Sequence, residues 1–496
     1  MRLNREILRL ALPSILANIT VPLVGMVDIA VVGHLGADGG MSAAAFIGGI
    51  SVGTMLFDLL YWNFAFLRSG TGGLTAQAYG RAPADAPLSQ HTEALNELSG
   101  ILGRALRIAL LSGVALIALQ WVVVQLAFLV VDCSPEVRQL ATRYFYIRIW
   151  AAPASLSLFA FKGWFIGLQD SLRPMLADLW VNLCNILLSV GLGFGLVVGG
   201  GSLAGSTAQG AGITLLPRLG FTGVAWGTVI AQWTGFFLCL FMIRKYLKLS
   251  DLLKILCSFC AEDFKQNTED QAVTRHRKLN LNLYIRSVAM IAVYIGFTML
   301  AARMGEMMLA VSAILMKLLM LFSYFTDGFA YAGEALTGRF IGERSEEGVR
   351  AAVRCTFAWS LALAVAFILL YGLGGVPLLR LMTSDAAVVD AGRPFLPWLL
   401  LMPLIGCPAF AWDGIYIGAT ASGDLRRSTV LCAIGFFAVY LAGCPLTGSP
   451  EQMLHLLMGA YFTHLAIRAL YLSVRYRNAI LRVHFPARPT LPHNLA

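Results

Sequence analysis

Charged residues are scarce in this sequence: they make up 13% of its 496 residues, about half of the roughly 25% that is usual in soluble domains. This scarcity argues against a soluble globular protein. The charges that are present cluster between long apolar runs, which are long enough to cross a hydrocarbon core of about 30 Å. The sequence therefore predicts an all-α polytopic membrane protein.

Sequence motifs for metal, redox or nucleophilic chemistry are missing. Nine cysteines are scattered along the chain, and Cys257 and Cys260 form a single C-x-x-C without a second ligand pair. His455 and His464 stand near the last apolar run without partners, and no Asp-rich metal motif appears. These absences argue against a membrane-embedded transferase, so we expect no enzyme activity, no metal and no cofactor.

Apolar length predicts twelve membrane helices. From Leu10 to Val32 the only charged residue is Asp28, and no cleavage site follows, so the first run is a membrane helix rather than a signal peptide. The predicted spans are 8–33, 42–67, 100–131, 138–162, 174–199, 221–247, 280–302, 307–335, 353–379, 394–420, 428–446 and 454–474.

The net charge of +10 is distributed as expected for a membrane protein rather than for a nucleic-acid partner. If the N-terminus is cytoplasmic, the predicted internal segments hold 27 Lys and Arg residues and the external segments hold 7, among them Arg138, Arg143 and Arg148. This excess places both termini in the cytoplasm by the positive-inside rule. We expect the bacterial cytoplasmic membrane and no nucleic-acid partner.

Two halves of the chain resemble each other. Gly163-Trp164-Phe165-Ile166-Gly167 near the end of the fourth span matches Gly414-Ile415-Tyr416-Ile417-Gly418 near the end of the tenth. Leu74-Thr75 with Gly80 matches Leu336-Thr337 with Gly342, at a similar offset. Six spans per half give parallel repeats, which commonly enclose a central cavity open to alternate sides. The expected division is an N-terminal lobe (1–247), a cytoplasmic linker (248–279), a C-terminal lobe (280–475) and a cytoplasmic tail (476–496).

Several segments resemble multidrug and toxic compound extrusion (MATE) transporters, and the DinF-like branch most of all. The resemblance runs in order over the whole chain, and the segments that show it are Leu10–Pro13, Asn18–Leu23, Val27–Gly36, Leu74–Gly80, Asp327–Ala335 and Asp413–Ala419. It implies a V-shaped pair of six-helix lobes and efflux of small molecules coupled to entry of H⁺ or Na⁺.

Asp28 is the main candidate for ion coupling. It lies about two-thirds along the first span, with no charge in the fifteen residues before it. An ionised Asp at the centre of a membrane helix costs roughly 2.5–3.5 kcal/mol on insertion scales, so desolvation favours the neutral acid. A carboxyl of this kind can take up a proton from one side and release it to the other. The resemblance also places the essential acid of the family here; an Asp that only caps the outer helix end is the alternative.

Two prolines precede Asp28 in the same span. Pro13 and Pro22 each remove a backbone hydrogen bond, which makes the helix bendable. In transporters that this chain resembles, the bend is thought to follow protonation. Membrane helices tolerate proline in any case, so a hinge role for Pro13 and Pro22 is one of two interpretations.

The fifth span has a polar face made of Asp178, Asn182, Asn185 and Ser189, which follow helical spacing. The family pattern Asn-x-x-x-Asp falls on Asn185 and Ser189, so Ser189 replaces the second carboxylate of the usual N-lobe site. Asp178 lies about 16 Å from Ser189 along the axis. It either joins the ion site after rearrangement or simply lies near the cytoplasmic helix end.

The eighth span has a second polar face, which consists of Lys317, Met320, Tyr324, Asp327, Tyr331 and Glu334. The tenth span adds Asp413 and the seventh adds Arg286. Lys317 needs a counter-ion in the membrane, and Asp413 and Asp327 are the candidates. The group is either a structural ion pair or a second ion or substrate site.

The hypothesis is therefore a monomeric antiporter that exports amphipathic, cationic small molecules in exchange for H⁺ or Na⁺, with Asp28 as the coupling carboxylate. Its partners are the substrate and the lipid bilayer. The alternative is a flippase for lipid-linked or other amphiphilic molecules, which calls for a cationic cavity. The charges predicted to be buried are mainly acidic, and this argues against a flippase.

Overall fold

The computed structural model describes residues 2–35, 42–82, 88–129, 131, 133–198, 213–247, 271–383 and 385–486. Within these ranges the chain is almost entirely helical, and twelve helical segments are long and apolar enough to cross a membrane. The predicted number of twelve membrane spans and the all-α membrane fold are confirmed.

The first half of the chain forms the N-lobe. Within the described ranges it also contains a two-stranded antiparallel sheet, in which Leu196 pairs with Leu216. The elements are α1 (Arg2–His34), α2 (Ala43–Trp62), α3 (Phe66–Gly80), α4 (Leu88–Ala118), α5 (Gln120–Ala127), α6 (Pro135–Arg148), η2 (Ile149–Ala151), α7 (Ala152–Gly167), α8 (Leu172–Phe194), β1 (Leu196–Val198), β2 (Ile213–Leu216) and α9 (Phe221–Ile243).

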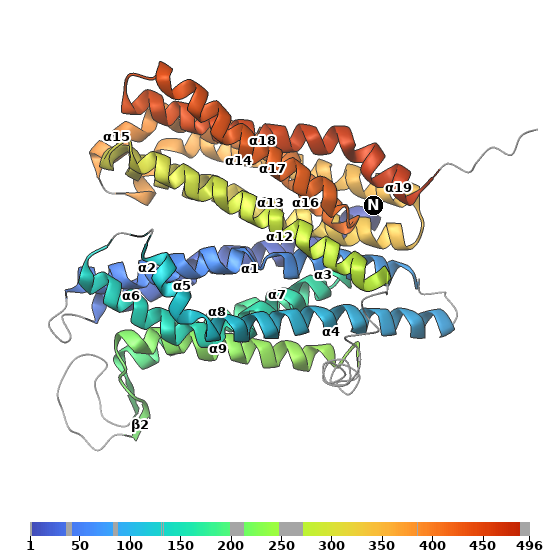
Figure 1. Ribbon diagram of the computed structural model, residues 1–496, viewed down its shortest axis with the longest axis horizontal. Coiled ribbons are helices and arrows are strands. Elements are labelled where there is room, and N and C mark those ends of the chain that lie inside the picture. The colour runs from blue at the N-terminus through green and yellow to red at the C-terminus, as the bar shows by residue number, and fades with distance from the viewer. Residues whose placement is uncertain are drawn as a thin grey trace, which may run out of the picture.

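The second half forms the C-lobe. Its elements are α12 (Gln271–Ala302), α13 (Glu306–Gly342), α14 (Glu346–Met382), α15 (Ala386–Gly392), η4 (Arg393–Phe395), α16 (Leu396–Gly418), α17 (Ser422–Gly443), η5 (Cys444–Leu446), α18 (Pro450–Tyr476), η6 (Arg477–Leu481) and α19 (Arg482–His484). Figure 1 shows the blue-to-green N-lobe beside the yellow-to-red C-lobe, with the N-terminus and α19 at the same end of the molecule.

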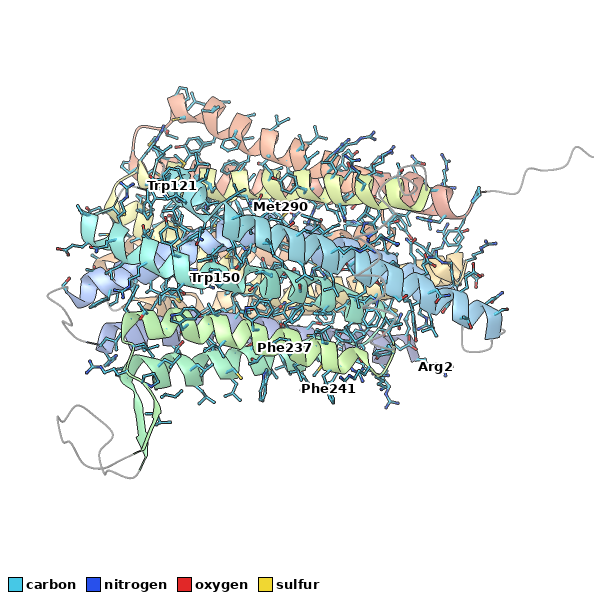
Figure 2. All side chains as sticks on the ribbon, turned by 60° about the horizontal axis from the view of Figure 1, so that its bottom comes forward. Arg2, Trp121, Trp150, Phe237, Phe241 and Met290 are labelled. Atoms are coloured by element: carbon cyan, nitrogen blue, oxygen red, sulfur yellow. The ribbon has the colours of Figure 1, made fainter. Side chains whose placement is uncertain are left out.

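The outer faces of both lobes are apolar, as a bilayer requires. In the N-lobe, Phe237 and Phe241 of α9 are 60% and 64% exposed, and in the C-lobe Leu373 of α14 and Leu470 of α18 are 85% and 66% exposed. Figure 2 shows Phe237 and Phe241 along the helix at the outer side of the bundle. In water such a surface would aggregate, whereas in lipid it needs no further partner.

Several predicted boundaries were wrong. The second span continues past residue 67: a turn at residues 63–65 joins α2 to α3, which runs to Gly80. Arg68 did not end the span because its charge is paired inside the protein. Part of the predicted linker, residues 271–279, belongs to α12, and the remaining linker residues, with Cys257 and Cys260, lie outside the described residues.

Two other segments also differ from their predictions. The start of the predicted tail is helical as far as His484, because Ile480 and Leu481 are apolar and pack into the C-lobe core. Arg138, Arg143 and Arg148, which the charge count assigned to an external segment, all belong to α6, and Arg148 donates hydrogen bonds to other side chains within the N-lobe.

Equivalent contacts recur within the two lobes. A Cβ on Gly163 would stand 2.1 Å from the Arg68 carbonyl oxygen, and one on Gly414 would stand 2.0 Å from the Ala330 carbonyl oxygen. Gln169 and Thr420 each lie two residues beyond the end of the matching helix and have positive φ values, 62° and 54° respectively. The same close helix contact and the same turn are therefore built twice.

The interface between α3 and α13 has pseudo-two-fold symmetry. A Cβ on Gly80 would lie 2.0 Å from the Arg339 carbonyl oxygen, and one on Gly342 would lie 2.3 Å from the Gln77 carbonyl oxygen. Since residues 77 and 339 are equivalent in the two repeats, as are 80 and 342, the contact is reciprocal. The lobes thus meet at the ends of α3 and α13 through backbone-to-backbone packing that any larger residue would disturb.

Candidate ion-coupling site

Asp28 lies in the N-lobe against α8. Asp28 is 8% exposed. It lies six residues before the end of α1, which corresponds to about 9 Å along the helix axis. The Ser189 hydroxyl donates to Asp28 Oδ1 at 2.8 Å. Among the residues that the structure describes, Ser189 is the one hydrogen-bond donor to this carboxyl.

Ser189 connects Asp28 to a longer polar chain. Its oxygen also lies 3.3 Å from Asn185 Oδ1, and Asn185 Nδ2 donates to Thr228 Oγ1 of α9 at 2.9 Å. A serine has one hydroxyl proton, so it can donate to Asp28 or to Asn185 but not to both. If Asp28 is ionised, Ser189 donates to it; if Asp28 is protonated, it can donate to Ser189, which then turns to Asn185.

The other predicted members of this group lie elsewhere. Asn182 Nδ2 donates to Thr20 Oγ1 at 2.7 Å and so joins α8 to α1 by a separate contact. Asp178 does not join the Asp28 site, because it is ion-paired with Lys162 of α7 at 2.8 Å. The residues that sequence reasoning missed here are Thr228 and Arg148.

Arg148 is a cation near Asp28. Its Nη1 donates to Tyr144 Oη at 3.1 Å and to Thr54 Oγ1 at 3.4 Å, and its guanidinium stacks 4.9 Å from the Phe57 ring centroid. It lies within electrostatic range of Asp28. The sequence analysis counted Arg148 only as an external charge, so its position beside Asp28 follows from the packing of α6 in the structure.

Among the described residues, Lys317 forms no ion pair with either of its two candidate counter-ions, Asp413 and Asp327. Asp413 Oδ2 already contacts Arg286 Nη2 at 2.8 Å and Arg468 Nη1 at 3.2 Å, and Arg468 is 1% exposed. Both guanidinium groups contact Oδ2 and balance its charge, while the buried Asp413 Oδ1 has no hydrogen-bond partner among the described residues. Lys317 instead has an exposed side chain that lies within electrostatic range of Asp58 of α2, another carboxylate that sequence reasoning missed.

The remaining residues of the α13 face lie where the lobes meet. Arg68 of α3 forms an ion pair with Glu334 at 3.0 Å and stacks 4.3 Å from the Tyr331 ring centroid. Asn18 Nδ2 of α1 donates to the Tyr324 carbonyl oxygen at 3.2 Å. The polar stripe of α13 is thus an interface with the N-lobe and not an isolated C-lobe site.

The prolines of α1 lie within one continuous helix. Pro13 and Pro22 are both interior to α1, which runs unbroken from Arg2 to His34. Each removes one backbone donor from the helix. Their role as hinges stays a prediction, because a straight helix and a bent one both accommodate them.

The prediction that the buried charges are mainly acidic was wrong. Among the intramembrane charges that are ion-paired, basic groups are as prominent as acids, because Arg68, Lys162, Arg286 and Arg468 each have a carboxylate partner. Likewise His455 has a partner, the Trp398 indole at 3.0 Å. Across the described ranges, no three His, Cys, Asp or Glu side chains gather as a metal site would require.

Comparison with known proteins agrees with this architecture. The "MatE" family model matches residues 13–190 and 283–446. "DNA damage-inducible protein F" of Escherichia coli is 32% identical over 475 residues, which cover 96% of this chain and 92% of that protein. "Probable multidrug resistance protein NorM" of Synechocystis is 24% identical over 371 residues, or 74% of this chain and 70% of the relative.

Solved structures show the same fold. A crystal structure of MATE in the bent conformation has a TM-score of 0.75 at 18% identity, covering 97% of this chain and 98% of that one. The Vibrio cholerae MATE transporter VcmN in its bent form also has a TM-score of 0.75, at 15% identity, covering 98% and 99%. The chain belongs to the MatE family, and it is a multi-pass membrane transporter of the multidrug and toxic compound extrusion type.

Proposed function

We propose that this protein exports amphipathic, cationic small molecules in exchange for H⁺, with Asp28 as the coupling carboxylate. The observation that supports this most directly is the buried Asp28–Ser189–Asn185 chain, which offers a different hydrogen-bond pattern to each protonation state of Asp28. We further propose that the protein acts as a monomer in the bacterial cytoplasmic membrane, with both termini in the cytoplasm.

The residues present favour H⁺ over Na⁺. A hard cation such as Na⁺ prefers several oxygen ligands with net negative charge. The N-lobe site has one carboxylate, because Ser189 stands where the family pattern has a second. In the C-lobe, Asp413 is neutralised by Arg286 and Arg468. A proton needs only one carboxyl group and a partner that can both donate and accept, which Ser189 provides.

The arrangement of the lobes supports an outward-open state. The contacts of α1 with α13 involve Ala11, Ile15 and Asn18, from its N-terminal half, while Asp28 further along contacts α8 of its own lobe. With the N-terminus in the cytoplasm, the lobes are therefore packed together on the cytoplasmic side. In this state Asp28 takes up H⁺ from outside, the bound cation leaves, and the lobes rock to release H⁺ inside.

Exchange of one H⁺ at Asp28 for one monovalent cation is electroneutral. Each unit of pH difference then supplies about 1.4 kcal/mol, which sustains roughly a tenfold substrate gradient. A pH gradient therefore suffices as the energy source for this step.

The test is substrate movement in proteoliposomes under separately imposed pH and Na⁺ gradients, with ethidium as the probe. The wild type should respond to the pH gradient and not to the Na⁺ gradient, and Asp28→Asn should lose the response. Asp390→Asn is the matched control, because Asp390 is 68% exposed in a local ion pair with Arg393. Undiminished coupling in Asp28→Asn would remove Asp28 from the mechanism.

A flippase is the second candidate, and one observation favours it: Lys317 and Arg148 place basic groups near Asp58. A cationic site of this kind suits the phosphate of an amphiphile. Movement of a fluorescent phospholipid between leaflets, with no response of ethidium to pH, would support the flippase over the antiporter.

A further inference from the structure

Eight charged side chains gather where the N-lobe and C-lobe meet, and we call them the interface cluster. They are four basic and four acidic groups, so the cluster is neutral when every member is ionised. Its members are Arg68, Lys162, Asp178, Arg286, Asp327, Glu334, Asp413 and Arg468. Ionised groups in a membrane interior are costly unless they are paired, so this balance stabilises the state seen here.

The cluster is divided unequally between the lobes. The N-lobe contributes two cations and one acid, for a net charge of +1, while the C-lobe contributes two cations and three acids, for a net charge of −1. The direct bond across the boundary is Arg68–Glu334 at 3.0 Å, and Glu334 is fully buried. The lobes therefore attract each other electrostatically at the side that must open to release H⁺ into the cytoplasm.

Asp327 differs from the other acids of the cluster. Asp178, Glu334 and Asp413 each have an ion-pair partner within 3.2 Å. Asp327 is half-buried and has no ion pair or hydrogen bond to its side chain among the described residues. A proton on any of the three paired acids would break a direct ion pair, whereas a proton on Asp327 would break none.

The surroundings of Asp327 are cationic on several sides. Arg68 of α3, Lys162 of α7 and Arg468 of α18 lie within electrostatic range, and Asp413 of α16 is the nearby acid. Its own helix adds Tyr324 and Tyr331, whose electrostatic neighbours include Asp327. The other helices packed here contribute Arg286 from α12, which is paired with Asp413, and uncharged contacts from α1 and α14: Ala11, Ile15, Asn18 and Thr356.

We propose that Asp327 is a second proton-binding site, and that its protonation weakens the attraction between the lobes and promotes opening on the cytoplasmic side. Protonation of Asp327 changes the net charge of the C-lobe part of the cluster from −1 to zero. The net charge of +1 on the N-lobe part, which includes Arg68 and Lys162, then has no opposite net charge across the interface. This inference rests on the proposed H⁺ antiport but uses a different carboxyl.

A second proton changes the energetics of the cycle. Two H⁺ entering for one monovalent cation leaving moves one net positive charge inward. A membrane potential of 100 mV then supplies about 2.3 kcal/mol per cycle, equivalent to roughly a fiftyfold substrate gradient. Electroneutral exchange at Asp28 alone would gain nothing from the potential.

The test measures the distance between the lobes as a function of pH and needs no substrate. Spin labels on Glu93→Cys of α4 and Glu347→Cys of α14, both exposed, report the cytoplasmic separation in a background without the native cysteines. All measurements are made on Asp28→Asn protein, so that Asp28 does not contribute. A single linked proton changes the ratio of open to closed molecules by up to tenfold per pH unit.

Asp28→Asn protein should open progressively on acidification, and Asp28→Asn with Asp327→Asn should stay at its low-pH ratio throughout. Asp327→Glu should keep the pH response and shows that the position tolerates substitution. Asp178→Asn also alters the charge balance of the cluster but should keep the response. A pH response that survives Asp327→Asn, or its absence in the Asp28→Asn parent, would overturn the proposal, while the antiport assay with Asp28 is independent of either result.

Discussion

The close packing of α3 on α13 makes a sharp prediction for Gly72→Ala. A Cβ at residue 72 would lie 2.0 Å from Glu334 Oε1 and 3.3 Å from the Gly163 carbonyl oxygen. Glu334 cannot simply swing aside, because its Oε2 is held by Arg68 at 3.0 Å. The methyl group therefore forces the carboxylate off Arg68 or forces the helices apart.

The cost follows from the pairing of two buried charges. Disrupting one partner of a buried ion pair costs about 3–5 kcal/mol. A loss of 3 kcal/mol confined to the cytoplasm-closed state would shift the ratio of open to closed molecules by more than about a hundredfold. The distance between spin labels on α4 and α14 reports this ratio directly, and the melting temperature of the purified protein reports any general destabilisation.

Two comparisons make this prediction refutable. Gly423→Ala is the control, because a Cβ at residue 423 would meet nothing within 4 Å; it should change neither measurement. Gly72→Ala combined with Glu334→Ala should cost little beyond Glu334→Ala alone, since the clashing carboxylate is gone. Equal effects of Gly72→Ala with and without Glu334, or no effect at all, would show that this contact does not hold the lobes together.

Two further predictions concern the hydrogen bonds of the N-lobe and the ion pairs of the C-lobe. Ser189→Ala removes the hydrogen-bond donor to Asp28, and such a bond to a charged acceptor is worth about 1.5–3 kcal/mol. Because its loss disfavours the ionised form of Asp28, the pH of half-maximal pH-driven transport should rise. An unchanged pH profile in proteoliposomes would argue against the Ser189–Asp28 bond. Asp413→Asn leaves Arg286 and Arg468 without their shared carboxylate, so the melting temperature should fall by an amount equivalent to about 3–5 kcal/mol, while Asp390→Asn at the exposed pair should leave it unchanged.

Helical periodicity correctly predicted which polar residues share a helix face. Asn185 and Ser189 share a face because they are four residues apart, and the structure places that face against Asp28. The twelve spans followed from apolar length. Both kinds of information are local, since each depends on residues within one helix.

Ion-pair partners on helices that are distant in the sequence could not be predicted from periodicity or apolar length. Arg468 is 55 residues from Asp413 in the sequence, and Arg68 is 266 residues from Glu334. Nothing in the sequence near Arg68 distinguishes a buried, ion-paired arginine from one that ends a membrane span, which is why the second span was predicted to stop too soon. The counter-ion of Lys317 was misassigned for the same reason: the nearest acids along α13 and α16 were considered, and α2 was not.

The reciprocal packing at the centre of the molecule has a consequence for how a duplicated chain can diverge. Residues 72 and 334 occupy equivalent places in the two repeats, yet one is glycine and the other is the glutamate that presses against it. In a dimer of two identical half-length chains, an acid at this place would face a copy of itself, and a glycine would leave both sides empty. When the two copies are joined in one polypeptide, each repeat can acquire a different residue at this place. The glycine that leaves space and the glutamate that fills it are then inherited together.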